Sequence, residues 1–313
     1  MKKGFLLYGF CLMGLWVAAQ KKKPAFFNRE ITLTTENDAY LFRQNDAYYT
    51  NGFFLTVRKA ATRKTRKLVE AYQLGQAIYT PFKRKTTGPA DIDRPYCGFL
   101  FLEYSQTSFS KEGVVLQVSG RVGEVGPASL GEAVQNSYHS LLRYSKFTGW
   151  QYQVRNALGI DLGFLYAHTI LEDSTWIKLV PVAQGSIGMN MTNAGIGSYL
   201  CIGSFEKNAN SALWNARVQT KETPTRRNHE LFVFWYPQVI YQVYNATIQG
   251  GLFSKGNGAV LAEPERWMFQ QSVGVCFAEG RWTSQLALVH QSKEAVTQQN
   301  KQNYGSITLS YRL

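Results

Sequence analysis

The last eight residues of this chain alternate strictly between apolar and polar side chains. In Ser306–Leu313 the residues Ile307, Leu309, Tyr311 and Leu313 are apolar, and the residues between them are polar. Because successive side chains of a β-strand point to opposite faces, such a segment has one apolar and one polar face. Similar segments fill most of the chain between polar or glycine-rich breaks. The sequence therefore predicts an all-β, antiparallel transmembrane β-barrel with lipid outside and a polar lumen inside.

Twelve segments have this character, and an even number of strands closes a barrel with both chain ends on one side. They cover residues 30–41, 48–59, 70–80, 97–107, 112–123, 151–168, 174–189, 194–206, 229–246, 265–278, 281–291 and 302–313. Pro237 leaves open a break within 229–246, because proline cannot donate to a β-ladder. Ser129–Leu142 lacks the alternation and predicts a short helix. With a periplasmic N-terminus, the connections 42–47, 81–96 and 124–150 face the exterior, so the helix belongs to an external loop.

Residues 1–19 predict a signal peptide. Lys2 and Lys3 precede the uncharged run Gly4–Ala19, and Val17 and Ala19 are small residues at the positions that a signal peptidase reads. The mature domain would then cover residues 20–313 and reside in a bacterial outer membrane. Composition alone, with 14% aromatic residues, also fits a secreted β-sandwich.

The net charge limits the classes of binding partner, and the number of cysteines limits the possible disulfide bonds. The formal charge of +13 falls to +11 once Lys2 and Lys3 are removed, which suits an anionic partner such as a phosphorylated lipid. Nucleic acid is not expected, because the chain has no nucleic-acid-binding motif and is exported. Most of these charges also fit ordinary solvated loops. The odd number of cysteines in the mature chain, Cys97, Cys201 and Cys276, argues against a disulfide framework.

The predicted helix carries the first candidate for chemistry. Gln135 and His139 are four residues apart and share one helical face, and Glu132 lies a further turn back. A histidine oriented by a polar neighbour can act as a general base. A single helical histidine is more often structural, so this spacing alone leaves both interpretations open.

Oxygen-bearing side chains gather at the predicted outer rim. They belong to Glu36–Asp38, at the end of the first strand, and to Tyr49–Gly52, at the start of the second. Such oxygens suit a hard cation such as Ca²⁺, with Asp38 as the expected ligand; a polar hairpin tip is the simpler alternative. Strict alternation sends Asn37 and Asp38 to opposite faces, so both serve one site only if the strand twists or bulges there.

A basic group enters the same rim from the next external loop. Lys83 and Lys85 lie within this loop, and Arg94 comes just before the fourth strand. These side chains either bind phosphate groups of a substrate or are simply solvated.

Five strings occur together in a fixed order. They are TENDAY (35–40), YYTNG (48–52), DRPYCGFL (93–100), GEVGPASLGEAVQNSYH (123–139) and GWQYQ (149–153). In sequence and order they resemble the outer-membrane lipid A 3′-O-deacylase family, over about the first half of the mature chain. The resemblance implies a twelve-stranded barrel and a Ca²⁺-dependent esterase that removes the 3′-linked acyloxyacyl group of lipid A in the outer leaflet.

The resemblance also implies roles for individual residues. His139 matches the catalytic histidine and Gln135 its helical partner, while Asn37, Asp38 and Thr50 match polar residues of the first two strands. A family lysine falls in the 81–92 loop, where Lys85 is the first candidate and Lys83 the second.

Two positions depart from the family's pattern. Ser145 stands where some members carry glutamate, and Asn156-Ala157 stands where an Asn-Glu pair is common. Both departures concern metal affinity or substrate preference more than the class of reaction.

The residues themselves are compatible with ester hydrolysis. His139 could deprotonate water, and Ca²⁺ near Asp38 could stabilise the oxyanion. The chain lacks a Gly-x-Ser-x-Gly elbow, so the nucleophile of an α/β-hydrolase is not expected. Two alternatives remain at this stage: a non-catalytic barrel serving as a pore or scaffold, and an outer-membrane phospholipase.

Overall fold

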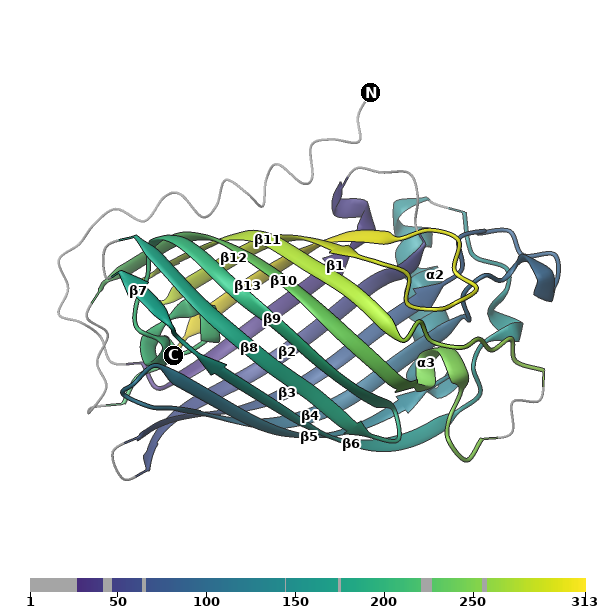
Figure 1. Ribbon diagram of the computed structural model, residues 1–313. Helices are drawn as coiled ribbons and strands as arrows, with labels where there is room; N and C mark the ends of the chain where they lie inside the picture. The colour runs from purple at the N-terminus through teal and green to yellow at the C-terminus, as the bar shows by residue number, and fades with distance from the viewer. Residues whose placement is uncertain are drawn as a thin grey trace.

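The computed structural model describes residues 27–41, 47–63, 66–143, 145–173, 176–220, 227–254 and 258–313. Twelve long antiparallel strands form a closed barrel (Figure 1). They are β1 (Arg29–Asn37), β2 (Tyr48–Arg63), β3 (Arg66–Thr80), β4 (Cys97–Phe109), β5 (Val114–Val125), β6 (Ala157–His168), β8 (Ile177–Gly188), β9 (Met191–Ser204), β10 (His229–Asn245), β11 (Trp267–Glu279), β12 (Trp282–Gln291) and β13 (Gln302–Arg312). The ring closes because β1 pairs with both β2 and β13, and β6 pairs with β8. The short β7 (Leu171–Asp173) pairs only with β8.

The predicted antiparallel twelve-stranded barrel is confirmed, and its inaccuracies lie at strand ends. The first strand was expected to reach residue 41 but ends at Asn37. The sixth was expected from residue 151 but begins at Ala157. Pro237 does not break β10, which pairs with β11 without interruption from His229 to Tyr241, although the pairing with β9 skips Pro237 and its neighbour Tyr236.

Helical elements occupy the connections. They are α2 (Gly131–Leu142), α3 (Ala246–Gln249) and the 3₁₀ turns η1 (Asp38–Leu41), η2 (Pro89–Asp91), η3 (Pro127–Ser129), η4 (Trp150–Tyr152), η5 (Asn208–Asn210) and η6 (Ala212–Trp214). The helix predicted at 129–142 is therefore α2, preceded by η3. Among the described residues, no helix has the length and apolar character needed to cross a membrane.

The two ends of the barrel differ. Figure 1 shows α2 and α3 at one end and the C-terminus at the other. Since even-stranded outer-membrane barrels have short periplasmic turns and longer external loops, we call the α2 end the outer end and the C-terminal end the periplasmic end. The predicted signal peptide, residues 1–19, lies outside the described residues.

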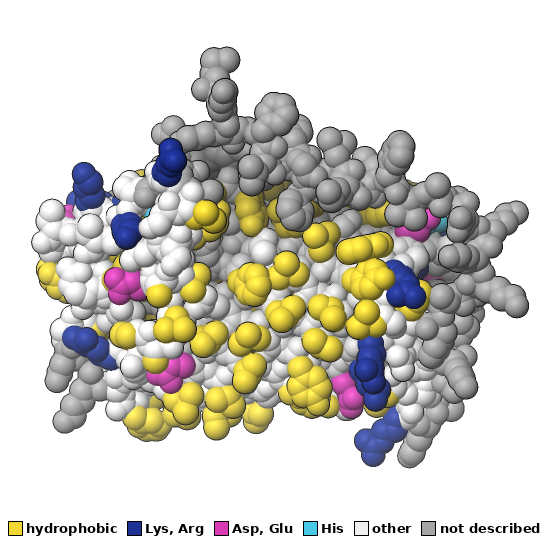
Figure 2. All heavy atoms as spheres, turned by 180° about the vertical axis from the view of Figure 1, so that it is seen from behind, with side chains coloured by type: hydrophobic (Ala, Val, Ile, Leu, Met, Phe, Trp, Pro, Cys, Tyr) yellow, Lys and Arg dark blue, Asp and Glu magenta, His cyan; other side chains and the backbone are white. Residues whose placement is uncertain are grey.

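An apolar belt surrounds the barrel wall. It consists of the exposed apolar side chains that alternate along the strands, among them Leu33, Phe53, Leu74, Leu102, Leu162 and Leu288. Figure 2 shows apolar side chains across the middle of the wall, with charged side chains toward its two ends. This distribution is that of a barrel in a lipid bilayer.

The interior is less uniformly polar than the sequence predicted. A cavity of about 270 Å³ lies between β4, β5, β6, β8 and β9 and is lined mainly by polar side chains, including Glu103, Arg121, Asp161 and Gln184. Buried apolar clusters also occupy the interior. One contains Tyr49, Tyr79, Phe99 and Phe101 near the outer end, and another contains Val69, Val115 and Val180 toward the periplasmic end.

The β9–β10 connection fills the periplasmic end of the lumen. We call its described residues 205–220 the plug. Ala216 and Val218 of the plug belong to the apolar cluster of the barrel interior. From the wall, the Lys67 ammonium donates to Ala216 O at 2.6 Å and to Asn210 Oδ1 at 2.9 Å, and Lys178 Nζ donates to Glu206 O at 2.6 Å.

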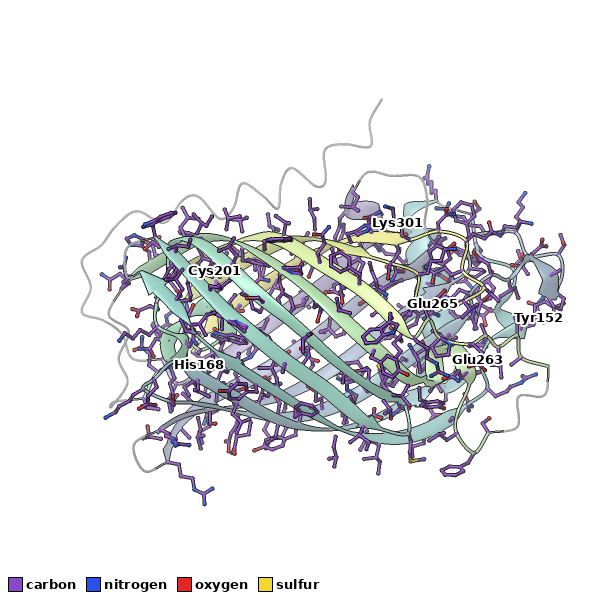
Figure 3. All side chains as sticks on the ribbon, viewed as in Figure 1. Tyr152, His168, Cys201, Glu263, Glu265 and Lys301 are labelled. Carbon is purple, nitrogen blue, oxygen red and sulfur yellow. The ribbon has the colours of Figure 1, made fainter. Side chains whose placement is uncertain are left out.

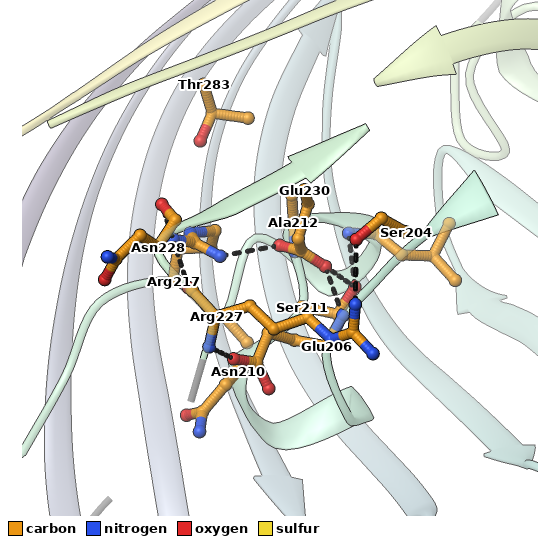
Figure 4. Close-up of polar contacts among 12 residues, drawn as sticks. Ser204, Glu206, Asn210, Ser211, Ala212, Arg217, Arg227, Asn228, Glu230 and Thr283 are labelled. Carbon is orange, nitrogen blue, oxygen red and sulfur yellow. Dashed lines mark hydrogen bonds and ion pairs between the residues drawn. The ribbon is translucent and has the colours of Figure 1, made fainter. Parts of the chain in front are cut away.

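One carboxylate of β10 organises the plug. Glu230 is fully buried and accepts hydrogen bonds from Glu206 N, Ser211 Oγ and Ala212 N at 2.8–2.9 Å. Arg217 Nη1 approaches the same carboxylate at 3.1 Å (Figure 4). Four donors of one segment thus converge on a single carboxylate of the wall, so the plug is held as a defined structure.

Candidate functional site

A row of five residues on the outer face of the wall forms the floor of the candidate site. They are paired across neighbouring strands in the order Gly98, Ile78, Asn51, Asn37 and Gly305. Each lies an even number of residues from the belt residues of its own strand and therefore on the same face as they do. The row thus faces away from the lumen. The site is therefore built on the lipid side of the barrel.

The end of β1 brings Asn37 and Asp38 to one region without a bulge in that strand. Asn37 is the last residue of β1, and Asp38 opens η1, so alternation no longer separates them. Asp38 Oδ2 accepts a hydrogen bond from Ala47 N at 2.9 Å, where the chain returns to β2. Asn37 Oδ1 accepts from Ala39 N at 2.7 Å, and its amide nitrogen donates to Asn51 Oδ1. Both side chains are buried and held in place.

A bulge in β2 supplies the neighbouring hydroxyl. The register of β2 against β3 shifts between Tyr49 and Asn51, which leaves Thr50 unpaired at the bulge. The Thr50 hydroxyl donates to Ile78 O at 3.3 Å and accepts from Asn51 Nδ2 at 3.4 Å. Thr50 is fully buried beside the row.

Helix α2 covers the row because two glycines allow close approach. A Cβ on Gly98 would lie 2.1 Å from Ser129 Oγ and 2.9 Å from Gly131 Cα, so a larger residue would displace the helix. Gln76 of β3 also reaches this segment and donates to Ser129 O at 2.6 Å. The start of α2 is thereby fixed against the outer face of β3 and β4.

Gln135 joins the helix to β2. Its Nε2 donates to Thr50 Oγ1 at 3.4 Å, and its Oε1 accepts from the indole Nε1 of Trp150 at 3.2 Å. Gln135 and Trp150 are both buried. The helix thus contacts β4 at Gly131 and β2 at Gln135, and His139 lies one turn further along it.

His139 is held by a backbone carbonyl. Its Nδ1 lies 2.7 Å from Ser145 O, its ring lies 5.7 Å from that of Phe147, and only 1% of the residue is exposed. Since a carbonyl oxygen can only accept a hydrogen bond, Nδ1 carries the hydrogen and Nε2 of the neutral ring keeps a lone pair. Ser145 thus orients the ring through its main chain, at the position where the family resemblance expects glutamate.

Of the remaining histidines, His168 and His229 lie at the periplasmic end, and His290 lies at the outer end of β12. Figure 3 shows His168 at the opposite end of the barrel from Tyr152, which follows α2 in the chain. His229 begins β10 at that same periplasmic end. His290 is paired with Asn303 through a 2.7 Å contact on β12 and β13.

The 81–96 loop places its two lysines differently. Lys83 Nζ lies 2.8 Å from Asp91 Oδ1, and hydrogen bonds from Lys83 and Thr87 lower the pKa of the Asp91 carboxyl. Lys85 is exposed and makes no ion pair among the described residues. Deeper in the loop, burial raises the pKa of the Tyr96 hydroxyl to about 12, so that hydroxyl remains neutral beside Thr86.

Arg94 does not join the basic loop surface. Its guanidinium is fully buried, lies 2.8 Å from Glu294 and 3.0 Å from Thr247 Oγ1, and stacks 3.9 Å from the centre of the Tyr79 ring. The arginine therefore links the connections before β4, after β10 and after β12. This placement is structural, in contrast to the substrate contact expected from the sequence.

The site's donor set is made of oxygen. No group of three or more His, Cys, Asp or Glu side chains comes together in the described part of the chain. Asp38, just beyond the row, contributes a carboxylate, and the amide oxygens of Asn37 and Asn51 and the hydroxyl of Thr50 are its neighbours in the chain or across the strands. Hard oxygens fit Ca²⁺, and a single carboxylate predicts weak rather than tight binding.

Sequence reasoning overlooked two groups of this site. Trp150, which holds Gln135, lies within the GWQYQ string, but the string itself does not reveal the contact. The orienting carbonyl of Ser145 carries no side-chain signal at all. Only the folded loop shows both.

The family model described as "Outer membrane protein LpxR" matches residues 6–313. The chain belongs to the LpxR family of outer-membrane proteins. Among solved structures, LpxR from Salmonella typhimurium matches with a TM-score of 0.74 at 19% identity, covering 91% of this chain and 100% of that one. This likeness confirms the barrel fold. The family match confirms the outer-membrane location.

Other solved barrels are less similar. The β domain of the Bordetella autotransporter BrkA matches with a TM-score of 0.48 at 9% identity, covering 92% of this chain and 99% of that one. The translocator domain of the autotransporter NalP from Neisseria meningitidis gives 0.44 at 10% identity, covering 98% and 95%. Among curated proteins, none matches this chain by sequence.

Proposed function

We propose that this LpxR-family chain is a lipid A 3′-O-deacylase: an esterase that hydrolyses the 3′-linked acyloxyacyl ester of lipid A from within the outer membrane. One observation carries the proposal. His139, with its tautomer set by Ser145 O, lies on a helix fixed to the lipid side of the wall. The floor of the site adjoins the belt, since exposed Phe53 is two residues from Asn51, or about 7 Å along the strand. An ester at the boundary of lipid headgroups and acyl chains is within reach there.

The reaction needs a base and a means of stabilising the oxyanion. Nε2 of His139 takes a proton from water as the water oxygen attacks the ester carbonyl. The tetrahedral oxyanion then collapses, the sugar oxygen leaves, and the imidazolium returns the proton to it. The products are a free acyloxyacyl carboxylic acid and lipid A with a 3′-hydroxyl.

Polar side chains in and beside the row position the reacting groups. The Gln135 amide is held between Trp150 and Thr50, so it can orient the water or the ester. Asp38, assisted by oxygens of Asn37 and Thr50, would hold Ca²⁺, which supplies electrostatic stabilisation of the oxyanion when bound.

The exposure of the basic side chains indicates which of them can contact the lipid A headgroup. Lys85 is the better candidate for a lipid A phosphate because it is exposed and makes no ion pair among the described residues, whereas Lys83 must leave Asp91. Arg94 is assigned to positioning the outer connections and not to substrate contact, because its guanidinium is already bonded to Glu294.

The plug favours an enzyme over a pore, because it fills the periplasmic end of the lumen with buried contacts. A phospholipase remains the second candidate, since the same water-activating histidine could hydrolyse a glycerophospholipid ester.

Mass spectrometry of lipid A tests the proposal. Cells that produce the intact chain should lose the mass of the 3′-acyloxyacyl group, and chelation of Ca²⁺ in isolated membranes should prevent the loss. His139→Ala and Asp38→Ala should leave lipid A intact, whereas His168→Ala, at the other end of the barrel, should not. Unchanged lipid A in every strain would refute the deacylase, and release of phospholipid fatty acids alone would support the phospholipase.

A further inference from the structure

Helix α2 has an apolar stripe that its packing on the barrel does not use. Leu130, just before the helix, and Val134 and Leu141 within it are 57%, 42% and 80% exposed. At about 100° per residue these three lie within roughly 40° of one another around the helix axis. We call them the α2 stripe.

The opposite side of the helix carries the site. Gln135 and His139 lie roughly 140° and 180° from Leu130 around the axis, and both are buried against the wall or its loops. Glu132, the one carboxylate of α2, lies roughly 200° from Leu130. The α2 stripe is therefore free of charge and faces away from the barrel.

Because α2 lies beside the belt, lipid is the expected neighbour of the α2 stripe. Gln76, which binds Ser129 O before the helix, is two residues from exposed Leu74 on the same face of β3, or about 7 Å. The helix thus lies at the outer edge of the belt, and its stripe continues the apolar surface that meets lipid. An uncharged apolar stripe opposite a polar face is the pattern of a helix lying in a membrane interface.

We propose that the α2 stripe is embedded among the acyl chains of outer-leaflet lipids, so that α2 is a membrane-interface helix as well as the cover of the site. The lipid surface holds the outward side of the helix while the row holds the inward side. This proposal does not depend on the deacylase reaction, because it concerns where the helix lies and not what His139 does.

Spin labelling tests the placement directly. Cys97, Cys201 and Cys276 are buried, so a nitroxide reagent added to the folded mature protein should label an introduced surface cysteine selectively. Val134→Cys and Leu141→Cys report the stripe. Leu102→Cys on the belt is the lipid control, Lys85→Cys is the water control, and Ala133→Cys is a matched exposed position of α2 outside the stripe. All are examined in vesicles of phosphatidylethanolamine and phosphatidylglycerol.

The readout is collision with oxygen, which concentrates in lipid, compared with a water-soluble nickel chelate. Positions 134 and 141 should resemble position 102, and position 133 should be closer to position 85. Water-like values at both stripe positions would overturn the proposal. Low collision rates with both reagents would overturn it too, because they would mean that protein, such as a second copy of the chain, covers the stripe.

Discussion

The two ends of the barrel use polar side chains in opposite ways. At the periplasmic end, Glu230 is fully buried in the lumen and accepts several short hydrogen bonds and an ion pair from the plug. At the outer end, on the lipid side, Thr50 takes part in contacts of 3.3–3.4 Å with Ile78, Asn51 and Gln135. Long contacts are weak and easily exchanged. The comparison separates a carboxylate held by several short contacts from a buried hydroxyl held only by long ones.

The largest expected effect is on catalysis at the outer end. His139→Ala should lower the rate of lipid A deacylation by roughly 10²–10⁴-fold, the usual contribution of a general base. The denaturation midpoint of the barrel should stay close to that of the wild type, because His139 lies outside the barrel's interior clusters. Rates on purified lipid A and urea unfolding, measured on the same preparation, check both halves. A variant that unfolds instead would assign His139 to structure.

A substitution that releases the plug should instead lower the stability of the barrel and leave catalysis nearly unchanged. Glu230→Ala leaves Arg217 and several backbone donors buried without their partner, which should cost about 3–5 kcal/mol of unfolding free energy. Deacylation by the folded fraction should be little changed. Urea titration measures the loss, and conductance in planar bilayers should reveal openings absent from the wild type. Glu230→Gln, which keeps the acceptor oxygen, should lose less; equal losses would argue that the charge is all that matters.

A smaller effect is expected from the residue that holds Gln135. Trp150→Phe keeps an aromatic side chain, although a smaller one, and removes the indole N–H, worth about 0.5–1.5 kcal/mol for a typical hydrogen bond. That corresponds to a fall of roughly 2- to 10-fold in kcat. The effect should vanish in a Gln135→Leu background, since the contact is already lost there. Additive losses in the double variant would contradict a shared role.

The exposed loop pair should matter least. Asp91→Asn removes the ion pair with Lys83, and because surface pairs contribute little, the unfolding midpoint should shift by no more than its measurement error. The variant frees Lys83, so activity should hold or rise slightly if either lysine binds a phosphate. A marked fall in stability would place this loop with the plug and not with the site.

Strand positions were largely predictable because alternation is a local property. The face on which a strand residue lies alternates along the chain. Ile31 and Leu33 therefore indicate the lipid-facing side of β1 without reference to any other strand. The end of β1 was not predictable in this way. Leu41 continues the odd-numbered apolar positions of Ile31 and Leu33, yet the chain leaves the strand at Asp38. In η1 the Tyr40 hydroxyl bonds to Thr35, and the Tyr40 Cβ lies over Gly305 of β13. That partner is far away in the sequence.

In the site too, features encoded in neighbouring residues were predictable, and features that depend on distant contacts were not. Gln135 and His139 were recognisable because helical spacing and family strings are both written in consecutive residues. The buried position of Arg94 could not be foreseen, because its partner, Glu294, is 200 residues away and only barrel closure brings the two together. Ser145 acts through a carbonyl, which every residue has, so no side chain could indicate it.

The sequence by itself determined a twelve-stranded barrel, its lipid-facing belt and a helix bearing a histidine, since each follows from periodicity over neighbouring residues. The tertiary structure alone decided that the helix lies on the lipid side of the wall, that Asn37 and Asp38 share a region, and that a connection plugs the lumen. These features depend on contacts between distant segments, and such contacts form only when the strands close into a ring.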